Sequence, residues 1–493
     1  MADNILYCGD NLDILRDYIK GETVDLIYLD PPFKSNQAYN VLFAEQNGSR
    51  SKAQIKAFED TWRWDQGAAE AYTEVIEKGP ERVSKVMQAF HTFLGESDML
   101  AYLSMMAPRL VELRRVLKPT GSIYLHCDPT ASHYLKMLID AVFEPGNFCN
   151  EIVWHYRKWP TGKYTFQRNH DVILFYARSD SRGRTFNQLF MERAPSTLKR
   201  FGKAKIVSGY DETGKRIPSQ TEPHDSEGVR QDDVWDIGRV PPIKQLFPTQ
   251  KPDPLLERII KASSNEGDTV LDPFCGCGTT IVVAQMLKRQ WIGIDITHLA
   301  VTLIKHRLQD MFGNQVSYKV IREPVSLPDA EALARQDPYQ FQWWTLGLVG
   351  ARPVEQKKGA DRGIDGCLYF HDEPKGRKTK KIILSVKAGH TGVAHVRELR
   401  GVVEREKAEI GVLITLQDPT RPMRTEAASA GFYDSPWGSR YPRMQILTVG
   451  ELLEGKGIDY PPSSQVNVTF KKAPKAKGKE LKAELLPFMG ENL

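Results

Sequence analysis

One short segment constrains the fold of this chain more than any other: residues 24–33, VDLIYLDPPF. Residues 24–29 are mostly apolar and partly β-branched, which predicts a buried strand. Pro31 and Pro32 end that strand, because a proline cannot donate a hydrogen bond to a sheet ladder. Asp30 is therefore expected at the carboxyl end of a strand, on a stiff turn, with Phe33 just beyond. Open α/β sheets bind ligands at that edge, although a plain turn would also fit these residues.

Strands and helices alternate on both sides of this segment. A helix, a Lys-Pro-Thr-Gly turn and a strand are predicted over 99–126, with further strands over 4–8, 151–157, 170–178, 268–274 and 291–296 and helices over 252–264 and 279–289. This alternation predicts an α/β fold with a Rossmann-like, mostly parallel sheet. Residues 34–97 are polar and are expected to be helical or irregular. Residues 180–248 lack clear periodicity, which suits an inserted recognition region better than a core.

A second strand also ends in an aspartate and a proline, within VLDPFCGCGTT at 270–280. Gly276 and Gly278 would let the backbone approach a ligand closely, as in dinucleotide-binding turns. The third glycine of the nucleotide fingerprint is absent, and Phe274 is unsuited to a phosphate cradle. An adenosine or amino-acid-like ligand therefore fits this turn better. Asp295, at the end of the next predicted strand, could accept hydrogen bonds from a ribose.

Positive charge is concentrated in one part of the chain. The 493 residues carry a net charge of only +5, but Arg157 to Arg216 hold fourteen Lys or Arg against five Asp or Glu. Aromatic residues such as Trp159, Tyr164 and Phe166 are interleaved with these charges. Such a stretch can be a solvated face, but its aromatic content favours contact with a polyanion.

Several motifs, taken in their order along the chain, resemble those of the amino-methylating DNA methyltransferases that use S-adenosylmethionine. They are GDNLDIL, DLIYLDPPF, GSIYLHCD, NEIVWHYR, HDVILFYARS, TQKP and LDPFCGCGTT, and they span about residues 3–312. The Asp-Pro-Pro-aromatic motif precedes the Gly-rich motif, which resembles the permuted β group of that family. The chain departs from the commoner tyrosine version of the first motif only in carrying Phe33.

The resemblance implies a role for each motif. Asp30, Pro31, Pro32 and Phe33 would form the catalytic clamp around a base flipped out of double-stranded DNA. The residues expected to contact S-adenosylmethionine are Asp10, Thr249, Lys251, Pro252, Asp272, Pro273, Phe274, Gly276, Gly278, Thr279 and Asp295. Asp10 could equally be the N-cap of the helix that follows it.

The chemistry explains the clamp. The lone pair of an exocyclic amine is delocalised into the base ring, so the amine is a poor nucleophile. Asp30 and the Pro31 carbonyl can accept hydrogen bonds from that amine, and Phe33 can stack on the base. Positioning and electrostatics would supply most of the rate, without a metal or a covalent intermediate. An Asp at the first position favours adenine N6, with cytosine N4 as the alternative.

The pattern changes after about Val325, and a second domain is expected at 336–460. GADRGIDG followed by IILSVKAG resembles the Mrr-like branch of the restriction-endonuclease fold. In that family an Asp, a Glu or Gln and a Lys bind a divalent metal such as Mg²⁺ and activate water. Asp365 and Lys387 match, whereas Ser385 replaces the Glu or Gln and is a weak magnesium ligand. Asp361 or Glu355 could supply the missing carboxylate, so nuclease activity stays open beside a DNA-binding or purely structural role.

The sequence thus predicts a permuted methyltransferase domain at 1–325, with target recognition at about 157–248, then the endonuclease-like domain and a lysine-rich tail at 461–493. The six cysteines lack a zinc-site spacing, and neither a signal peptide nor a membrane span is evident. We expect a cytoplasmic, site-specific DNA methyltransferase in a restriction-modification or defence setting, with a homodimer as one option for its assembly. The alternatives are a combined methyltransferase and nuclease, and a DNA-binding regulator without catalysis.

Overall fold

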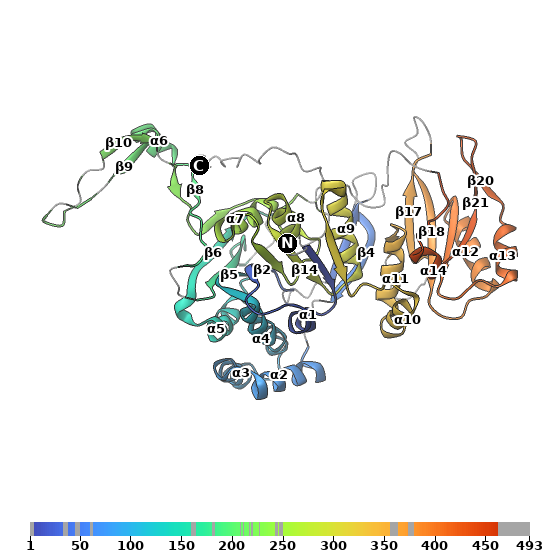
Figure 1. Ribbon diagram of the computed structural model, residues 1–493, viewed down its shortest axis with the longest axis horizontal. Coiled ribbons are helices and arrows are strands. Elements are labelled where there is room, and N and C mark those ends of the chain that lie inside the picture. The colour runs from blue at the N-terminus through green and yellow to red at the C-terminus, as the bar shows by residue number, and fades with distance from the viewer. Residues whose placement is uncertain are drawn as a thin grey trace.

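The computed structural model describes residues 4–32, 38–44, 50–59, 63–158, 164–179, 183–207, 209–210, 212–215, 217, 220–225, 227–241, 245, 250–354, 363–372 and 379–461. Its largest element is a nine-stranded sheet of order β12-β6-β7-β5-β2-β13-β14-β1-β15 (Figure 1). The bounds are β12 Val234–Asp236, β6 Phe148–His155, β7 His170–Ala177, β5 Leu117–Cys127, β2 Val24–Leu29, β13 Thr269–Asp272, β14 Gln290–Asp295, β1 Asn4–Cys8 and β15 Tyr318–Ile321.

The direction of the strands decides which residues can meet. β7 is antiparallel to both of its neighbours, β5 and β6, whereas every other neighbouring pair in this sheet is parallel. The start of β7 therefore lies at the same sheet edge as the carboxyl ends of β2, β5, β13 and β14. The α/β class with a mostly parallel sheet is confirmed, and the strands predicted on either side of the clamp are present.

Helices cover both faces of this sheet. Ile27 and Leu29 face a cluster with α1 (Asn11–Tyr18), α4 (Asp98–Val116) and α5 (Ser132–Phe143). Leu26 and Tyr28 face the opposite cluster, with α7 (Asp253–Ser263), α8 (Thr279–Met286) and α9 (His298–Phe312). This alternation follows from the two-residue period of a strand, and burial on both faces explains why 24–29 has so little polar character.

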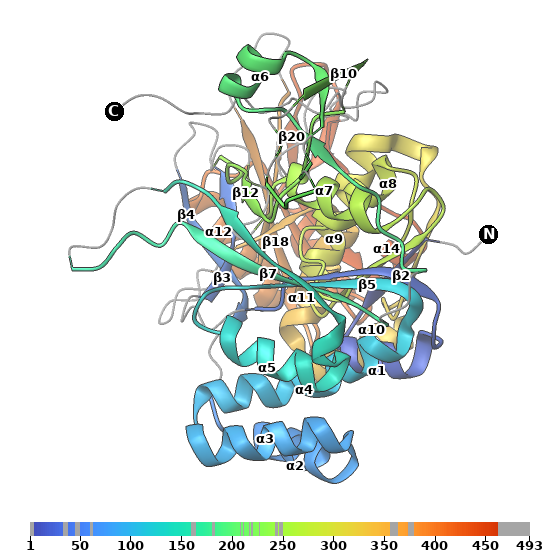
Figure 2. The ribbon, with the colours of Figure 1, turned by 90° about the vertical axis from the view of Figure 1, so that its left-hand side faces the viewer.

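The segment between β2 and α4 differs in part from the expectation. β3 (Ala38–Ala44) and β4 (Arg50–Glu59) form an antiparallel pair, before α2 (Gln66–Lys78) and α3 (Glu81–Leu94). The helical expectation for 34–97 was therefore wrong over the first part. A period-two pattern of Ala53, Ile55 and Ala57 was the available signal for a strand. Figure 2 shows α2 and α3 beyond α4 and α5.

An arm of short elements projects from the sheet between β7 and β12 (Figure 1). It contains β8 (Phe190–Met191) paired with β11 (Val229–Arg230), α6 (Pro195–Phe201), and β9 (Ala204–Val207) paired with β10 (Gln220–Asp225). Of these elements, β8, α6 and β9 lie within the basic stretch from Arg157 to Arg216, and all five lie within the recognition region predicted at about 157–248.

A second, five-stranded sheet follows, of order β16-β17-β18-β19-β22. Its strands are β16 Arg352–Pro353, β17 Gly366–Phe370, β18 Lys380–Lys387, β19 Ile410–Thr415 and β22 Met444–Thr448. One face packs against α10 (Leu327–Gln336), α11 (Pro338–Leu348) and α14 (Val449–Leu453), and the other against α12 (Val393–Arg405) and α13 (Arg421–Ala428). The remaining elements are β20 Phe432–Asp434 paired with β21 Arg440–Pro442, and the short 3₁₀ turns η1 Pro145–Asn147 and η2 Gly313–Gln315.

Candidate active site

Acidic side chains gather at one edge of the nine-stranded sheet. Asp30 follows β2, Asp272 and Asp295 end β13 and β14, and Asp171 lies at the start of the reversed strand β7. β2 and β13 are direct neighbours, with Leu26 opposite Val270 and Ile27 opposite Leu271. The two motifs on which the sequence interpretation rests therefore lie side by side, although 244 residues separate Ile27 from Leu271.

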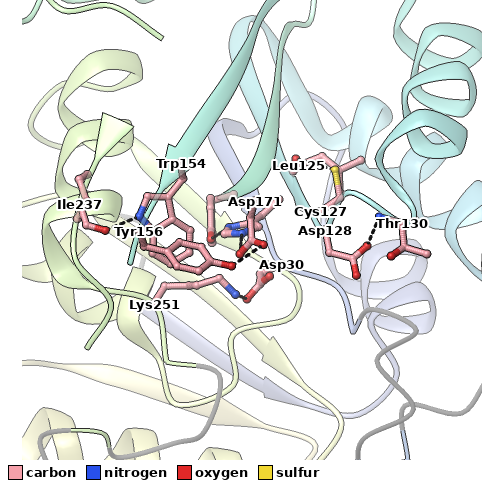
Figure 3. Close-up of polar contacts among 12 residues, drawn as sticks. Asp30, Leu125, Cys127, Asp128, Thr130, Trp154, Tyr156, Asp171, Ile237 and Lys251 are labelled. Atoms are coloured by element: carbon pink, nitrogen blue, oxygen red, sulfur yellow. Dashed lines mark hydrogen bonds and ion pairs between the residues drawn. The ribbon is translucent and has the colours of Figure 1, made fainter. Parts of the chain in front are cut away.

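Asp30 is held by a cation. Its Oδ2 accepts a hydrogen bond from the Nζ of Lys251, and both side chains are largely buried, at 19% and 13% exposure. Figure 3 shows this pair beside Asp171 and Tyr156. Pro31 is buried next to it, and Phe33 lies outside the described residues. Lys251 was predicted to contact the cofactor, and the structure pairs its side chain with Asp30.

A chain of hydrogen-bonded side chains lies next to Asp30 and Lys251. Tyr28 Oη lies 2.9 Å from His126 Nδ1, and His126 Nε2 lies 3.3 Å from Asp171 Oδ2. Tyr156 Oη donates to Asp171 Oδ1 at 3.0 Å. Because β5 and β7 are antiparallel, His126 near the end of one strand reaches Asp171 near the start of the other.

The pKa shifts of Asp171 and Tyr28 agree with the hydrogen bonds that these side chains make. Burial alone would raise the pKa of Asp171, but its hydrogen bond with His126 and the nearby charge of Lys251 hold the pKa below its ordinary value. Burial raises the pKa of the Tyr28 hydroxyl, with Asp30 adding to the effect. Tyr28 is thus a neutral hydroxyl and Asp171 a carboxylate. Sequence reasoning missed this chain, although its members stand in the quoted motifs GSIYLHCD, NEIVWHYR and HDVILFYARS.

The Gly-rich turn after β13 is built around Asp272. Its Oδ2 accepts from Thr280 Oγ1 at 2.6 Å and its Oδ1 from the backbone N–H of Phe274 at 3.0 Å. Burial raises the pKa of Asp272 to about 7. Asp272 is buried, and these bonds hold both of its carboxyl oxygens inside the turn, so the structure gives Asp272 a part in shaping the turn.

The two glycines of the turn differ in what they provide. Gly278 has φ +75°, and an added Cβ would lie 2.8 Å from Cγ1 of Ile304, so only glycine fits there. Gly276 has φ +51°, and an added Cβ would meet none of the described atoms within 4 Å. The backbone at Gly276 is therefore open to an approaching ligand.

Asp295 closes the turn from the neighbouring strand. Its Oδ2 accepts from the Gly276 N–H, and its Oδ1 accepts from the N–H and Oγ1 of Thr297, all at 2.9 Å. Burial raises its pKa, which these hydrogen bonds oppose. Each carboxylate oxygen can accept more than one hydrogen bond, so Asp295 retains capacity for a ribose hydroxyl.

The other predicted cofactor residues belong to several segments of the chain. Asp10 caps α1 by accepting from Leu12 N at 2.7 Å and pairs with Arg109 Nη2, also at 2.7 Å. Asn11, which the sequence did not single out, donates from Nδ2 to the Pro273 carbonyl at 2.7 Å and ties α1 to the turn. Thr279 Oγ1 accepts from the Nη1 of Arg307 at 3.1 Å. Pro252 precedes α7, Phe274 is half-buried, and Thr249 lies outside the described residues.

In the candidate metal site of the second sheet, the carboxylate of Asp365 already accepts hydrogen bonds from other residues of the protein. Asp365 Oδ2 accepts from Ser385 Oγ at 3.0 Å and from Val386 N at 2.7 Å, and Lys387 Nζ lies 4.0 Å away. Within the described ranges, no three His, Cys, Asp or Glu side chains group as metal ligands. Glu355 and Asp361 fall outside those ranges.

No helix in the described part of the chain is both long and apolar enough to cross a membrane.

Comparisons with known proteins agree with this geometry. A family model described as DNA methylase matches residues 24–306, and one described as NACHT-associated inactive Restriction Endonuclease 1 matches residues 339–454. The type II methyltransferase M.HpaI of Haemophilus parainfluenzae is 31% identical over 257 residues, 51% of this chain and 74% of that protein. M.BamHI of Bacillus amyloliquefaciens is 28% identical over 313 residues, covering 62% and 57%. The DNA adenine methyltransferase YhdJ of Escherichia coli K12 is 33% identical over 191 residues, covering 38% and 60%.

Proposed function

Because the chain belongs to the DNA methylase family, of the type that methylates N6 or N4 amines, we propose that it methylates the N6 amine of an adenine flipped out of duplex DNA. Methyl transfer from S-adenosylmethionine to DNA is the reaction of that family. The choice of adenine, the roles of single residues and the restriction-modification or defence setting are our proposals. The observation that carries the proposed residue roles is the pairing of a largely buried Asp30 with Lys251, at the same sheet edge as the open turn at Gly276.

The residues at the sheet edge fit the methyl donor. The open backbone at Gly276 leaves room for a ligand, and Asp295 offers carboxylate oxygens to ribose hydroxyls. When bound, S-adenosylmethionine would supply an electrophilic methyl group on its sulfonium. Since β2 and β13 are neighbours, the clamp and the donor turn open at the same edge.

The clamp itself would prepare the amine. Asp30 and the Pro31 carbonyl accept hydrogen bonds from the N6 amine and so localise its lone pair on nitrogen. Lys251 holds one carboxylate oxygen of Asp30 and leaves its other oxygen to the base. The chain of Tyr28, His126 and Asp171 fixes the strand end from which Asp30 projects. Preorganised groups of this kind supply much of the rate in many enzymes.

Sequencing that reports modified bases tests the proposal directly. The chain would be expressed in cells without other DNA methyltransferases, with an Asp30→Ala variant as control. We expect N6-methyladenine at one recurring motif, absent in the control. N4-methylcytosine would establish the cytosine alternative, and unmodified DNA would favour a DNA-binding regulator.

Replacing Lys251 tests its assignment to the clamp. We expect Lys251→Met to lower kcat by about tenfold to a hundredfold, the size of a lost hydrogen bond to a charged group. Affinity for S-adenosylmethionine, measured by calorimetry, should stay within a few-fold, and Lys251→Arg should recover part of the rate. Weakened binding of S-adenosylmethionine with an unchanged kcat would return Lys251 to the cofactor site that the sequence predicted.

We infer that the second sheet does not cleave DNA. A magnesium ion near Asp365 would find one carboxylate that already binds Ser385 and Val386, and no described group of three His, Cys, Asp or Glu side chains to complete its coordination. Purified protein with Mg²⁺ should leave both unmethylated and methylated plasmid intact, as followed on a gel. Ser385→Glu would place a carboxylate at the position where the related nucleases have Glu or Gln. Cleavage by the unaltered protein that is lost in both Asp365→Ala and Lys387→Ala would establish the combined methyltransferase and nuclease instead.

A further inference from the structure

The hairpin of β6 and β7 continues beyond the sheet edge where Asp30 lies. His155 at the end of β6 pairs with His170 at the start of β7, and the N–H of Tyr156 donates to the Asn169 carbonyl at 2.8 Å. Residues 157–168 lie past this last bond, and their described parts reach outward from the sheet (Figure 2). We call the described part of this segment, residues 157–158 and 164–168, the hairpin tip.

The hairpin tip has an unusual composition. Its seven residues, Arg157, Lys158 and the run YTFQR at 164–168, include three Lys or Arg, two aromatic residues and no Asp or Glu. Tyr164 is 96% exposed and Phe166 is 100% exposed, the highest values among the large apolar side chains of the described residues. Arg157, Lys158 and Arg168 are exposed beside them. Exposed aromatic rings among cations fit a partner that offers both flat apolar surfaces and negative charge.

The residue before the hairpin tip, Tyr156, lies beside Asp30 and Lys251 (Figure 3). Tyr156, the last residue before the tip, donates from its hydroxyl to Asp171, which also contacts His126 below the clamp. Figure 3 shows Tyr156 and Asp171 beside the pair of Asp30 and Lys251. A nucleic acid whose base reaches Asp30 would therefore have its neighbouring nucleotides close to the tip.

We propose that the hairpin tip binds duplex DNA at the target site, with Tyr164 and Phe166 stacking on the bases beside the extruded one. Arg157, Lys158 and Arg168 contact the flanking phosphates. The inference rests on the proposed function, since it assumes that the base at Asp30 comes from a duplex. A base that leaves the helix loses its stacking and pairing, and inserted apolar side chains can replace the lost stacking. The tip thus serves extrusion of the base, separately from the projecting arm of β8 to β11.

Kinetics on two substrates test this role. The recognition motif found by sequencing is placed in a duplex with the target base paired, and in a second duplex with the target base opposite an abasic site. For Tyr164→Ala/Phe166→Ala we expect kcat/KM to fall about tenfold to a hundredfold on the paired duplex, the range of base-aromatic stacking. On the unpaired duplex the loss should stay within about threefold, because the base no longer has to be extruded. Phe93→Ala removes another exposed aromatic ring, on α3, and should change neither rate.

A binding measurement separates failure of the inference from failure of the proposed function. By fluorescence anisotropy, the unaltered protein should bind a duplex with one abasic site more tightly than an intact duplex, and the double variant should lose that preference. Equal losses of rate on both substrates, or an unchanged rate on the paired duplex, would overturn the role of the tip. If the unaltered protein methylates neither duplex, the proposed function fails and the binding preference alone decides the role of the tip. Since both side chains are exposed, the melting temperature should not change.

Discussion

Replacing Asp30 by alanine is expected to reduce methyl transfer by at least about a hundredfold, the cost of removing a preorganised polar group that acts on the reacting atoms. Asp30 is the group that would accept a hydrogen bond from the target amine, and the Pro31 carbonyl alone cannot localise the lone pair equally well. Affinity for S-adenosylmethionine should stay within a few-fold, because the donor turn is built on Asp272 and Asp295. Transfer of a labelled methyl group to DNA measures the first quantity and calorimetry the second.

Asp30→Ala also leaves Lys251 largely buried without its carboxylate, which could lower stability as well as activity. The double variant Asp30→Ala/Lys251→Met removes both charges together and serves as the matched control. We expect it to melt closer to the unaltered protein than Asp30→Ala does, while remaining inactive. Activity near the unaltered level in either variant would refute the proposed catalytic role of Asp30.

Asp295→Ala should act on the donor instead of the base. Loss of a buried hydrogen-bond acceptor costs about 1–3 kcal/mol, so the Kd for S-adenosylmethionine should rise by about fivefold to 150-fold. The variant also frees the N–H groups of Gly276 and Thr297, so part of the loss would come from a loosened turn.

A donor analogue that lacks one ribose hydroxyl separates these two contributions. If Asp295 binds the ribose, the unaltered protein should prefer S-adenosylmethionine over the 2′- or 3′-deoxy analogue that lacks the contacted hydroxyl. Asp295→Ala should then bind donor and analogue alike, as in a double-mutant cycle. An undiminished preference in the variant would leave Asp295 with a purely structural role, and unchanged affinity would move the donor site elsewhere.

Much of the architecture was predictable because buried parallel strands leave a clear trace in a sequence. The apolar runs that end in Asp30, Asp272 and Asp295 gave the strands, their carboxyl ends and hence one shared edge. The prediction failed where a contact depends on strand direction. Nothing local to Asp171 reveals that β7 runs against its neighbours, and only that reversal brings Asp171 to His126.

Lys251 shows that the partner of a single side chain is also hard to predict from the sequence. Its motif was visible, but whether its side chain turns toward the donor turn or toward Asp30 depends on how the segment before α7 crosses the sheet edge. The sequence likewise suggested two roles for Asp10, and the structure shows its cap on α1 and its ion pair with Arg109. Candidate residues could thus be collected from the sequence, whereas their partners required the fold.

The adjacency of β2 and β13 has a consequence for how the chain reaches its native state. The Thr269 N–H donates to Asp25 at 2.9 Å across 244 residues, so a central pairing of the sheet is among the most distant along the chain. Folds dominated by such distant pairings form slowly. At ribosomal speeds, one hydrogen-bonding edge of β2 would stay without its neighbouring strand for roughly 10–50 s during synthesis. A nascent chain that ends before β13 therefore has Asp30 at the end of β2 but lacks the Gly-rich turn, and the shared sheet edge forms only once β13 and β14 have been made.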